Sequence, residues 1–244
     1  MKTLLADKVV VITGGGGGIG RATALALAEQ GARIALCGGH NIEKLKKTVS
    51  LVKNAGADVF DLPGDLTDNS FISSCIQQIH QRFNAIDVLI NNAGIAINKS
   101  FEATSAEELD HIYKINVKAP FILCQQVLPY LRRSKCPAIV NIASVVAHKG
   151  YPNQAAYAAS KHAILGFSKS LANEVYLEGI RVHTLCPGGV YTEMVKLARP
   201  DLSPEGMIMP EEIARTILFL LEQRGNAVID EINIRRMGKP PYDG

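Results

Sequence analysis

The hydrophobic positions of the chain fall into two alternating kinds of segment. Short runs of Val, Ile and Leu, such as residues 8–13, are typical of strands buried on both faces of a parallel sheet. Longer stretches, either rich in Ala and Leu (residues 19–30) or amphipathic and basic (residues 41–54), are typical of helices. Glycines and capping residues separate the segments, which predicts regular alternation of strand and helix.

Strands are expected at residues 8–13, 33–37, 57–62, 86–90, 138–143, 180–185 and 228–234. Helices are expected at residues 19–30, 41–54, 68–83, 105–131 and 157–177, and a last one begins at Pro210. Pro120 and Pro129 should divide or kink the helical region 105–131, because proline cannot donate the helical hydrogen bond. This order predicts an α/β fold of the Rossmann type, a doubly wound parallel seven-stranded sheet with helices on both faces.

The pattern contains no linker, internal repeat or domain boundary, so residues 1–244 are expected to form a single domain. Residues 186–209 are the longest stretch without a clear pattern, and a connection of that length is uncommon unless it has a function. It follows the sixth expected strand at the edge where open α/β sheets bind ligands. We therefore expect this segment to be a substrate lid.

Five consecutive glycines lie between the first expected strand and the first expected helix. Residues 13–20 read Thr-Gly-Gly-Gly-Gly-Gly-Ile-Gly. Backbone of this kind can approach a pyrophosphate closely, and the helix that follows offers free N–H groups and the positive end of its dipole. A flexible glycine turn is the alternative, but the strand–turn–helix setting favours nucleotide binding.

A second group of residues suggests proton transfer. Tyr157 and Lys161 are four positions apart, so on a helix they share one face. A phenol is a poor base at neutral pH, and a neighbouring ammonium lowers its pKa. Ser144 follows the fifth expected strand, at the same sheet edge, and its hydroxyl could bond the same substrate oxygen. An ordinary helix face is the alternative for Tyr157 and Lys161 taken alone.

Composition excludes several other classes of protein. Hydrophobic residues make up 47% and charged residues 20%, which is typical of a globular chain with a sizeable core. No apolar run approaches the roughly 18 residues of a membrane-spanning helix, and the net charge of +3 is too small to imply a nucleic-acid partner. Five scattered cysteines without a CxxC pair favour a reducing, cytoplasmic location. The histidines show no metal-ligand spacing, so no metal is expected.

Together these motifs resemble the short-chain dehydrogenase/reductase family, including its 3-oxoacyl-ACP-reductase-like members, over essentially the whole chain. The motifs that carry the resemblance are Thr13-Gly14-x-x-x-Gly18-Ile19-Gly20, Asp65-Leu66, Asn91-Asn92-Ala93-Gly94, Asn116-Val117, Ser144, Tyr157-x-x-x-Lys161 and Pro187-Gly188 with Thr192. The resemblance implies an NAD(P)-dependent enzyme that interconverts a carbonyl and a secondary alcohol by hydride transfer. A dinucleotide-binding regulatory or scaffold protein is the alternative, although it would not need the proton-transfer residues.

The resemblance also implies roles for individual residues. Tyr157 would be the general acid/base, Ser144 would polarise the substrate carbonyl, and Lys161 would bind nicotinamide-ribose hydroxyls and depress the tyrosine pKa. Asn116 would hold a water that links Lys161 to solvent. The expected cofactor-binding residues are Thr13, Gly14, Gly18, Ile19, Gly20, Gly39, His40, Asp65, Leu66, Asn92, Ala93, Gly94, Tyr157, Lys161, Pro187, Gly188, Val190 and Thr192. Tyr151, Tyr191 and Met194 are expected to line the substrate.

The end of the second expected strand bears on the choice of cofactor. Residues 36–41 read Leu-Cys-Gly-Gly-His-Asn and contain no acid that would accept both ribose hydroxyls and repel a 2′-phosphate. His40 and Lys44 could supply positive charge, so NADP(H) is favoured over NAD(H). The alternative for His40 is an ordinary turn residue.

Further departures from the family pattern leave the substrate and the assembly open. His183 replaces the asparagine of many relatives, Glu178 replaces a basic residue of the ketoacyl reductases, and residues 230–236 lack their glycine-rich ending. Acyl thioesters, sugars or polyols, and simple ketones all remain possible substrates. Arg132 and Arg133 could dock an acidic carrier protein, or could be a solvated helix end. A homo-oligomer, tetramer or dimer, is expected.

Overall fold

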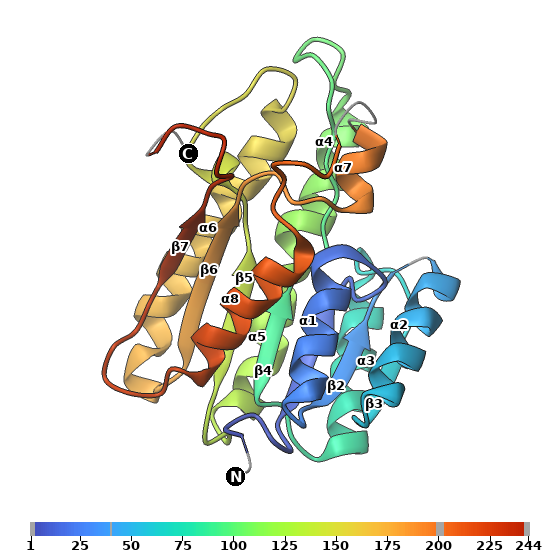
Figure 1. Cartoon of the computed structure of the whole chain (residues 1–244), viewed down its shortest axis with the longest axis vertical. Coiled ribbons are helices and arrows are strands. Elements are labelled where there is room, and N and C mark those ends of the chain that lie inside the picture. The colour runs from blue at the N-terminus through green and yellow to red at the C-terminus, as the bar shows by residue number, and fades with distance from the viewer. Residues whose placement is uncertain (1–2, 40, 199–202, 242–244) are drawn as a thin grey trace.

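The computed structural model describes residues 3–39, 41–198 and 203–241, and within them seven strands form one parallel sheet (Figure 1). The strands follow the order β3-β2-β1-β4-β5-β6-β7, which confirms the expected doubly wound Rossmann architecture. Their bounds are β1 Val9–Thr13, β2 Arg33–Cys37, β3 Val59–Leu62, β4 Val88–Asn91, β5 Ala138–Ile142, β6 Arg181–Pro187 and β7 Glu231–Ile234. The helices are α1 Gly18–Glu29, α2 Ile42–Asn54, α3 Asn69–Phe83, α4 Ala106–Tyr113, α5 Ala119–Leu131, α6 Ala155–Val175, α7 Glu193–Ala198 and α8 Pro210–Glu222.

Two apolar layers hold helices against the two faces of the sheet. In β1, Val10 and Ile12 pack toward α1, α2 and α8, whereas Val9 and Val11 pack toward α3, α5 and the C-terminal part of α6. All four side chains are fully buried, as the continuous apolar run predicted. Helices therefore cover both faces of the central strands, and the strand ends are left for ligands.

The order in which strands are added to the sheet reverses at β1, which pairs with β2 on one side and β4 on the other. Loops that leave the carboxyl ends of these neighbouring strands run in opposite directions, so a crevice opens between them. The glycine run after β1 and the Asn-Asn-Ala-Gly segment at the end of β4 both lie at this crevice. The fold thus brings the motifs of the sequence to one edge.

A π-helical turn, and not one of the prolines expected to do so, interrupts the helical region that begins after Ser105. Residues Lys114–Lys118 form a π-helical turn between α4 and α5, and Pro120 lies in the first turn of α5. Pro129 sits inside α5 without ending it. A π-turn carries one extra residue, so it re-aims neighbouring side chains and is common at functional sites. The helical region is divided as expected, but the π-helical turn Lys114–Lys118 divides it and the prolines do not.

Two expected elements near the carboxyl end also differ. β7 is shorter than residues 228–234, and only Glu231–Ile234 pair with β6. Residues 186–209, expected to lack regular structure, begin inside β6 and contain α7. The backbone N–H of Tyr191 donates to the Ile208 carbonyl, so the base of this segment is closed.

The departures at His183 and Glu178 have local structural explanations. His183 is buried in β6, where Nδ1 lies 2.6 Å from the Ile229 carbonyl, and burial lowers its pKa. The Glu178 carboxylate accepts two bonds from Arg132, which places this arginine in an intramolecular pair. All five cysteines are buried and unbridged. No helix in the described ranges is long and apolar enough to cross a bilayer.

Candidate active site

A cavity of about 820 Å³ opens at the carboxyl edge of the sheet. Its walls come from the glycine loop, the ends of β4, β5 and β6, the start of α6 and the segment after β7. Such a cleft, with a few polar groups converging on apolar walls, is the usual form of a small-molecule site. The cavity is continuous from the glycine loop to Tyr157, which allows one ligand to reach both.

The glycine loop has the shape that a dinucleotide requires. Gly14 has φ +69°, and a Cβ on it would lie 2.9 Å from the Ala93 Cα. A Cβ on Gly20 would lie 2.5 Å from the Gly14 carbonyl oxygen. The N-terminus of α1 has no side-chain cap, so its N–H groups are available to an anion. These features fit the pyrophosphate of a nicotinamide dinucleotide.

Hydrogen bonds of the Thr13 and Asn92 side chains join the end of β1 to the end of β4 beside this loop. The Thr13 hydroxyl accepts hydrogen bonds from the backbone N–H groups of Asn92 and Ala93, both at 3.0 Å. The Asn92 amide donates to the Thr13 carbonyl at 2.9 Å and to the Gly14 carbonyl at 3.2 Å. Thr13 is 1% exposed, so its role in the structure is to hold the crevice rather than to touch a ligand.

Ser144, Tyr157 and Lys161 meet at the opposite part of the cavity. Ser144 begins the short 3₁₀ turn Val145–Ala147 after β5, and Tyr157 and Lys161 lie one turn apart on α6. The Ser144 side chain hydrogen-bonds that of Tyr157, and its Oγ lies 3.3 Å from the Pro187 carbonyl. The Lys161 ammonium donates to the Ile142 carbonyl at 2.8 Å and lies 5.7 Å from the Tyr157 ring centroid. The structure therefore groups the three residues that sequence spacing selected.

The pKa of Tyr157 differs from the expectation. Burial raises it, and the hydrogen bond with Ser144 lowers it in part. The Lys161 ammonium donates to the Ile142 carbonyl instead of to the phenol. Burial also lowers the pKa of Lys161, to about 8. At neutral pH the site therefore holds a protonated phenol beside a mostly protonated amine.

Asn116 lies in the π-helical turn and is completely buried. Its Oδ1 accepts from the Ile95 N–H at 2.8 Å, and its Nδ2 donates to the Ile95 carbonyl at 2.9 Å and to Ser160 Oγ at 3.0 Å. The side chain is thus occupied in fixing the strand end after β4 to α6. It does not line the cavity, so any contribution to a proton relay must pass through its neighbours.

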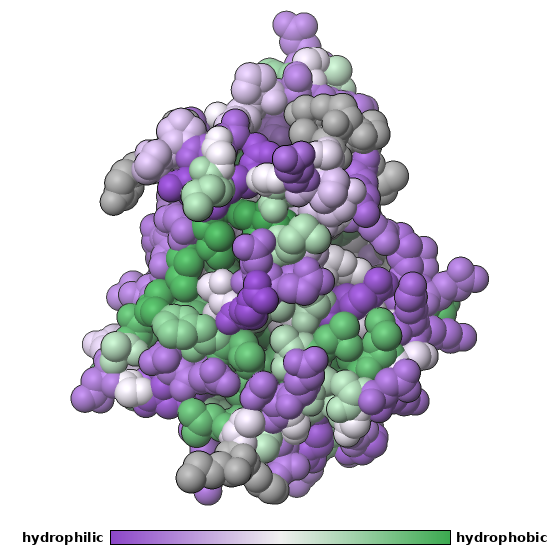
Figure 2. Space-filling view, viewed as in Figure 1, coloured by the Kyte–Doolittle hydropathy of each residue, from purple (hydrophilic) through white to green (hydrophobic). Residues whose placement is uncertain are grey.

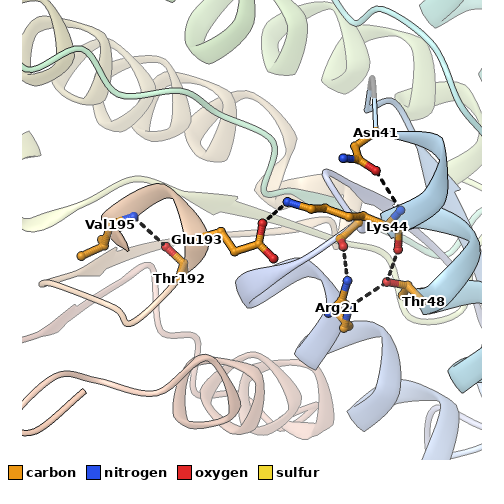
Figure 3. Close-up of polar contacts among 8 residues, drawn as sticks. Arg21, Asn41, Lys44, Thr48, Thr192, Glu193 and Val195 are labelled. Atoms are coloured by element: carbon orange, nitrogen blue, oxygen red, sulfur yellow. Dashed lines mark hydrogen bonds and ion pairs between the residues drawn. The ribbon is translucent and has the colours of Figure 1, made fainter. Parts of the chain in front are cut away.

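An ion pair crosses the cavity near the glycine loop (Figure 3). Lys44 of α2 and Glu193, the first residue of α7, point toward one another and form a short ion pair. The Lys44 carbonyl accepts a hydrogen bond from the Thr48 hydroxyl, and this hydroxyl accepts one from Arg21 Nε. Lys44, expected to serve a 2′-phosphate, is therefore engaged by the segment that was expected to form a lid.

Most of the expected site residues line this one cavity. They are Gly14, Gly18, Ile19, Gly39, Asp65, Leu66, Asn92, Ala93, Gly94, Ser144, Tyr151, Tyr157, Lys161, Pro187, Gly188, Val190, Thr192 and Met194. Thr13, Gly20 and Asn116 instead support the residues that do. Tyr191 is not part of the wall, and its ring lies 4.3 Å from the Lys196 ammonium. His40 lies outside the described residues.

The basic part of the wall is a correction to the sequence reasoning, which interprets Arg235, Arg236 and Lys239 as a solvated edge. Arg235, Arg236 and Lys239, which follow β7, line the cavity together with Met207. The sequence marks residues 230–236 as atypical but does not indicate which way they run. Only the register of β7 on β6, where Ile234 pairs with Pro187, places them beside Gly188.

Comparison with known proteins agrees with this geometry. A family model described as short chain dehydrogenase matches residues 8–203. A 3-oxoacyl-[acyl-carrier-protein] reductase of Chlamydia trachomatis is 33% identical over 240 residues, 95% of this chain and 97% of that protein. A crystal structure of levodione reductase has a TM-score of 0.87 at 32% identity, covering 95% of this chain and 96% of its own.

A third relative is an alcohol dehydrogenase from Thermococcus sibiricus, solved with 5-hydroxy-NADP. Its TM-score is 0.87 at 28% identity, covering 96% of this chain and 98% of its own. The family match, these relatives and the assembled Ser144, Tyr157 and Lys161 favour an enzyme over a scaffold. The chain belongs to the short-chain dehydrogenase/reductase family, whose NAD(P)-dependent members interconvert carbonyl and alcohol groups.

Proposed function

We propose that this enzyme reduces carbonyl compounds that carry an anionic group, uses NADP(H) in preference to NAD(H), and relies on Tyr157 as its acid/base. The observation that carries the proposal is one cavity whose wall includes the glycine loop, Ser144, Tyr157 and Lys161, and a cationic segment after β7. The bound nicotinamide supplies or accepts the hydride. The chain itself binds and orients the cofactor and the substrate, and it moves the proton.

The proton chemistry follows from the charge states of the site. The raised pKa of Tyr157 keeps its phenol protonated at neutral pH, which is the form needed to donate a proton to a carbonyl oxygen. Ser144 bonds the same phenol and is placed to donate to the same substrate oxygen. Lys161 keeps its ammonium near neutral pH and is placed to bind ribose hydroxyls and to stabilise the phenolate after transfer.

Two features support the preference for NADP(H). Lys44 lies in the cavity wall beside the glycine loop, where a Cβ on Gly16 would lie 3.6 Å from the Lys44 Cβ, and the described end of β2 carries no acid. The Thermococcus relative was solved with an NADP derivative. Glu193 opposes the preference, because it neutralises Lys44 until the ion pair opens.

Arg236 supports an anionic substrate. Its guanidinium is half-buried, and Nη1 donates to the Met207 sulfur at 3.1 Å, which is a weak acceptor. No carboxylate pairs with Arg236 among the residues that the structure describes. Within the described residues this guanidinium makes that one weak side-chain hydrogen bond, and such a group on the wall of a cavity is suited to a carboxylate or phosphate. The neighbouring Arg235 is occupied, since its Nη1 lies within 3.2 Å of three backbone carbonyls.

The test compares oxo acids with their methyl esters, using NADPH and NADH in turn. We expect the acids to be reduced with the higher kcat/KM, and Arg236→Gln to lower that value by about 10–150-fold, equivalent to ~1.5–3 kcal/mol for hydrogen bonds to a charged group. The esters should change little. Arg215→Gln, on the exposed side of α8, is the matched control. Equal kcat/KM for acids and esters in the wild-type enzyme would contradict the anionic preference.

Three further parts of the proposal concern organisation. Residues 1–244 act as a single domain, and residues 186–209 move as a lid whose closed base is the Tyr191–Ile208 bond. The chain forms a homo-oligomer, tetramer or dimer. Apolar surface around α8 and β7 supports this (Figure 2), where Phe219 and Val228 are 47% and 48% exposed. Buried, unbridged cysteines are compatible with a cytoplasmic location.

A further inference from the structure

Three side chains that are distant in the sequence converge beside the active site but outside its cavity. His148 follows the 3₁₀ turn that begins at Ser144, Cys186 lies in β6, and Glu231 begins β7. One nitrogen, sulfur or oxygen atom from each lies within 4.8 Å of the other two. We propose that His148, Cys186 and Glu231 form a binding site for Zn²⁺.

Strand register places two of these residues on the same face. Thr184 pairs with Glu231 and Cys186 pairs with Asn233, and residues two apart on a strand share a face. Because paired residues on neighbouring strands also point the same way, Cys186 and Glu231 project together. His148 approaches from the adjoining turn, where its N–H donates to the Val145 carbonyl at 3.1 Å. The convergence is thus fixed by backbone on all three sides.

The donor set is chemically suited to zinc. Zn²⁺ takes thiolate, imidazole and carboxylate ligands, and sites with three protein ligands keep a fourth position for water. Hard ions such as Mg²⁺ prefer an all-oxygen set, so the Cys186 sulfur and His148 nitrogen disfavour them. One thiolate and one carboxylate balance the charge of the ion, which suits a site whose sulfur is fully buried.

The geometry needs only small adjustments. Zinc holds sulfur at about 2.3 Å and nitrogen or oxygen at about 2.0–2.2 Å, so any two ligand atoms lie at most about 4.5 Å apart. The His148 and Glu231 atoms, now 2.6 Å apart, separate slightly as the ion enters between them. Their side chains are 29% and 23% exposed, which gives the ion a path from solvent.

Ion binding replaces two existing interactions. The His148–Glu231 contact is exchanged for two coordination bonds, and Lys169, whose ammonium lies 3.6 Å from Glu231, is 62% exposed and free to turn into solvent. Burial raises the pKa of the Cys186 thiol to about 12. Coordination must therefore displace this proton to the buffer, and the proton by which His148 Nε2 bonds Glu231 must leave that nitrogen as well, so binding strengthens as pH rises.

The site is coupled to catalysis through Ser144. The Ser144 backbone N–H lies close enough to the Cys186 sulfur to lower the pKa of its thiol in part, and the Ser144 Oγ lies 3.3 Å from the carbonyl of Pro187, the next residue in the chain. His148 ends the turn that Ser144 begins, and Cys186 lies beside Ser144. Zinc bound to both side chains would therefore restrain the turn at its two ends. We expect occupancy to slow turnover by restricting Ser144, an effect that rests on the proposed function.

The experiment titrates the full-length protein with Co²⁺, as a spectroscopic stand-in, and with Zn²⁺ by calorimetry. We expect one equivalent of Co²⁺ to produce a thiolate-to-cobalt absorption band that Zn²⁺ abolishes. His148→Gln and Glu231→Gln should each weaken Zn²⁺ binding by at least about 10–100-fold, the loss that removal of even an outer-shell partner causes. Cys186→Ser should abolish the band. His111→Gln and Cys136→Ser, remote residues of the same types, should leave both titrations unchanged.

The outcomes separate the site from its effect on activity. Absence of the band, or equal Zn²⁺ affinity in the wild type and the folded His148→Gln variant, would overturn the proposed site. Because His148 lies at the surface end of its turn, this variant tests the site even if Cys186→Ser fails to fold. Turnover should fall with the same midpoint as the band rises. A band with unchanged turnover would overturn only the coupling to Ser144.

Discussion

Glu193→Gln tests whether the lid segment competes with the cofactor for Lys44. In the structure the Lys44 ammonium is paired with Glu193, so a 2′-phosphate can engage it only after that pair opens. The two side chains are 44% and 50% exposed, and exposed pairs of this kind are worth about 0.2–1 kcal/mol. Removing the carboxylate should therefore tighten NADP(H) binding by about 1.4–5-fold.

Calorimetric titration with NADP⁺ and NAD⁺ at low and high salt measures this effect. NAD⁺ lacks the 2′-phosphate, so its affinity should change little, and the gain for NADP⁺ should shrink as salt screens the charges. Glu43→Gln is the matched control, because Glu43 is exposed one residue from Lys44 and changes the net charge equally. A Glu193→Gln variant that binds both cofactors more tightly by the same factor would refute the reasoning.

Three other predictions test separate parts of the account. Gly20→Ala places a Cβ 2.5 Å from the Gly14 carbonyl oxygen, so it should destabilise the fold by about 1–3 kcal/mol and weaken dinucleotide binding. Gly17→Ala is the control and should do neither, because no atom lies within 4 Å of the new Cβ. Lys161 loses its proton near pH 8 when folded and near 10.5 when unfolded, so its contribution to the free energy of unfolding should rise between these values. Urea denaturation should show this rise in the wild type but not in Lys161→Met, and parallel pH profiles would contradict it. Residues 186–209 should gain hydrogen-exchange protection when NADPH binds, and equal protection in both states would indicate a static loop.

The sequence was most informative where local pattern and strand order act together. Buried runs such as Val9–Thr13 predicted the strands, and the motifs that follow them necessarily meet because parallel strands end at one edge. The spacing of Tyr157 and Lys161 placed both on one face of α6, as the structure has them. These inferences needed only periodicity and the positions of glycines.

What the sequence could not reveal depends on tertiary contacts. The π-helical turn Lys114–Lys118 leaves no mark in the apolar pattern, and the Lys44–Glu193 pair joins residues 149 positions apart. The raised pKa of Tyr157 reflects burial, which spacing alone does not report. His148, Cys186 and Glu231 have no ligand spacing, so only the register of β6 and β7 brings them together.

Single-turnover hydride transfer in Tyr157→Phe tests the central claim, that this phenol carries the proton. The substitution removes one hydroxyl, which costs about 1 kcal/mol of stability, so folded protein with cofactor bound remains measurable. We expect cofactor affinity to stay within error of the wild type and the rate of hydride transfer to fall by about 10²–10⁴-fold, the usual contribution of a positioned acid/base. A rate close to that of the wild type would contradict the account, because Tyr157 would then be an ordinary residue of the α6 face.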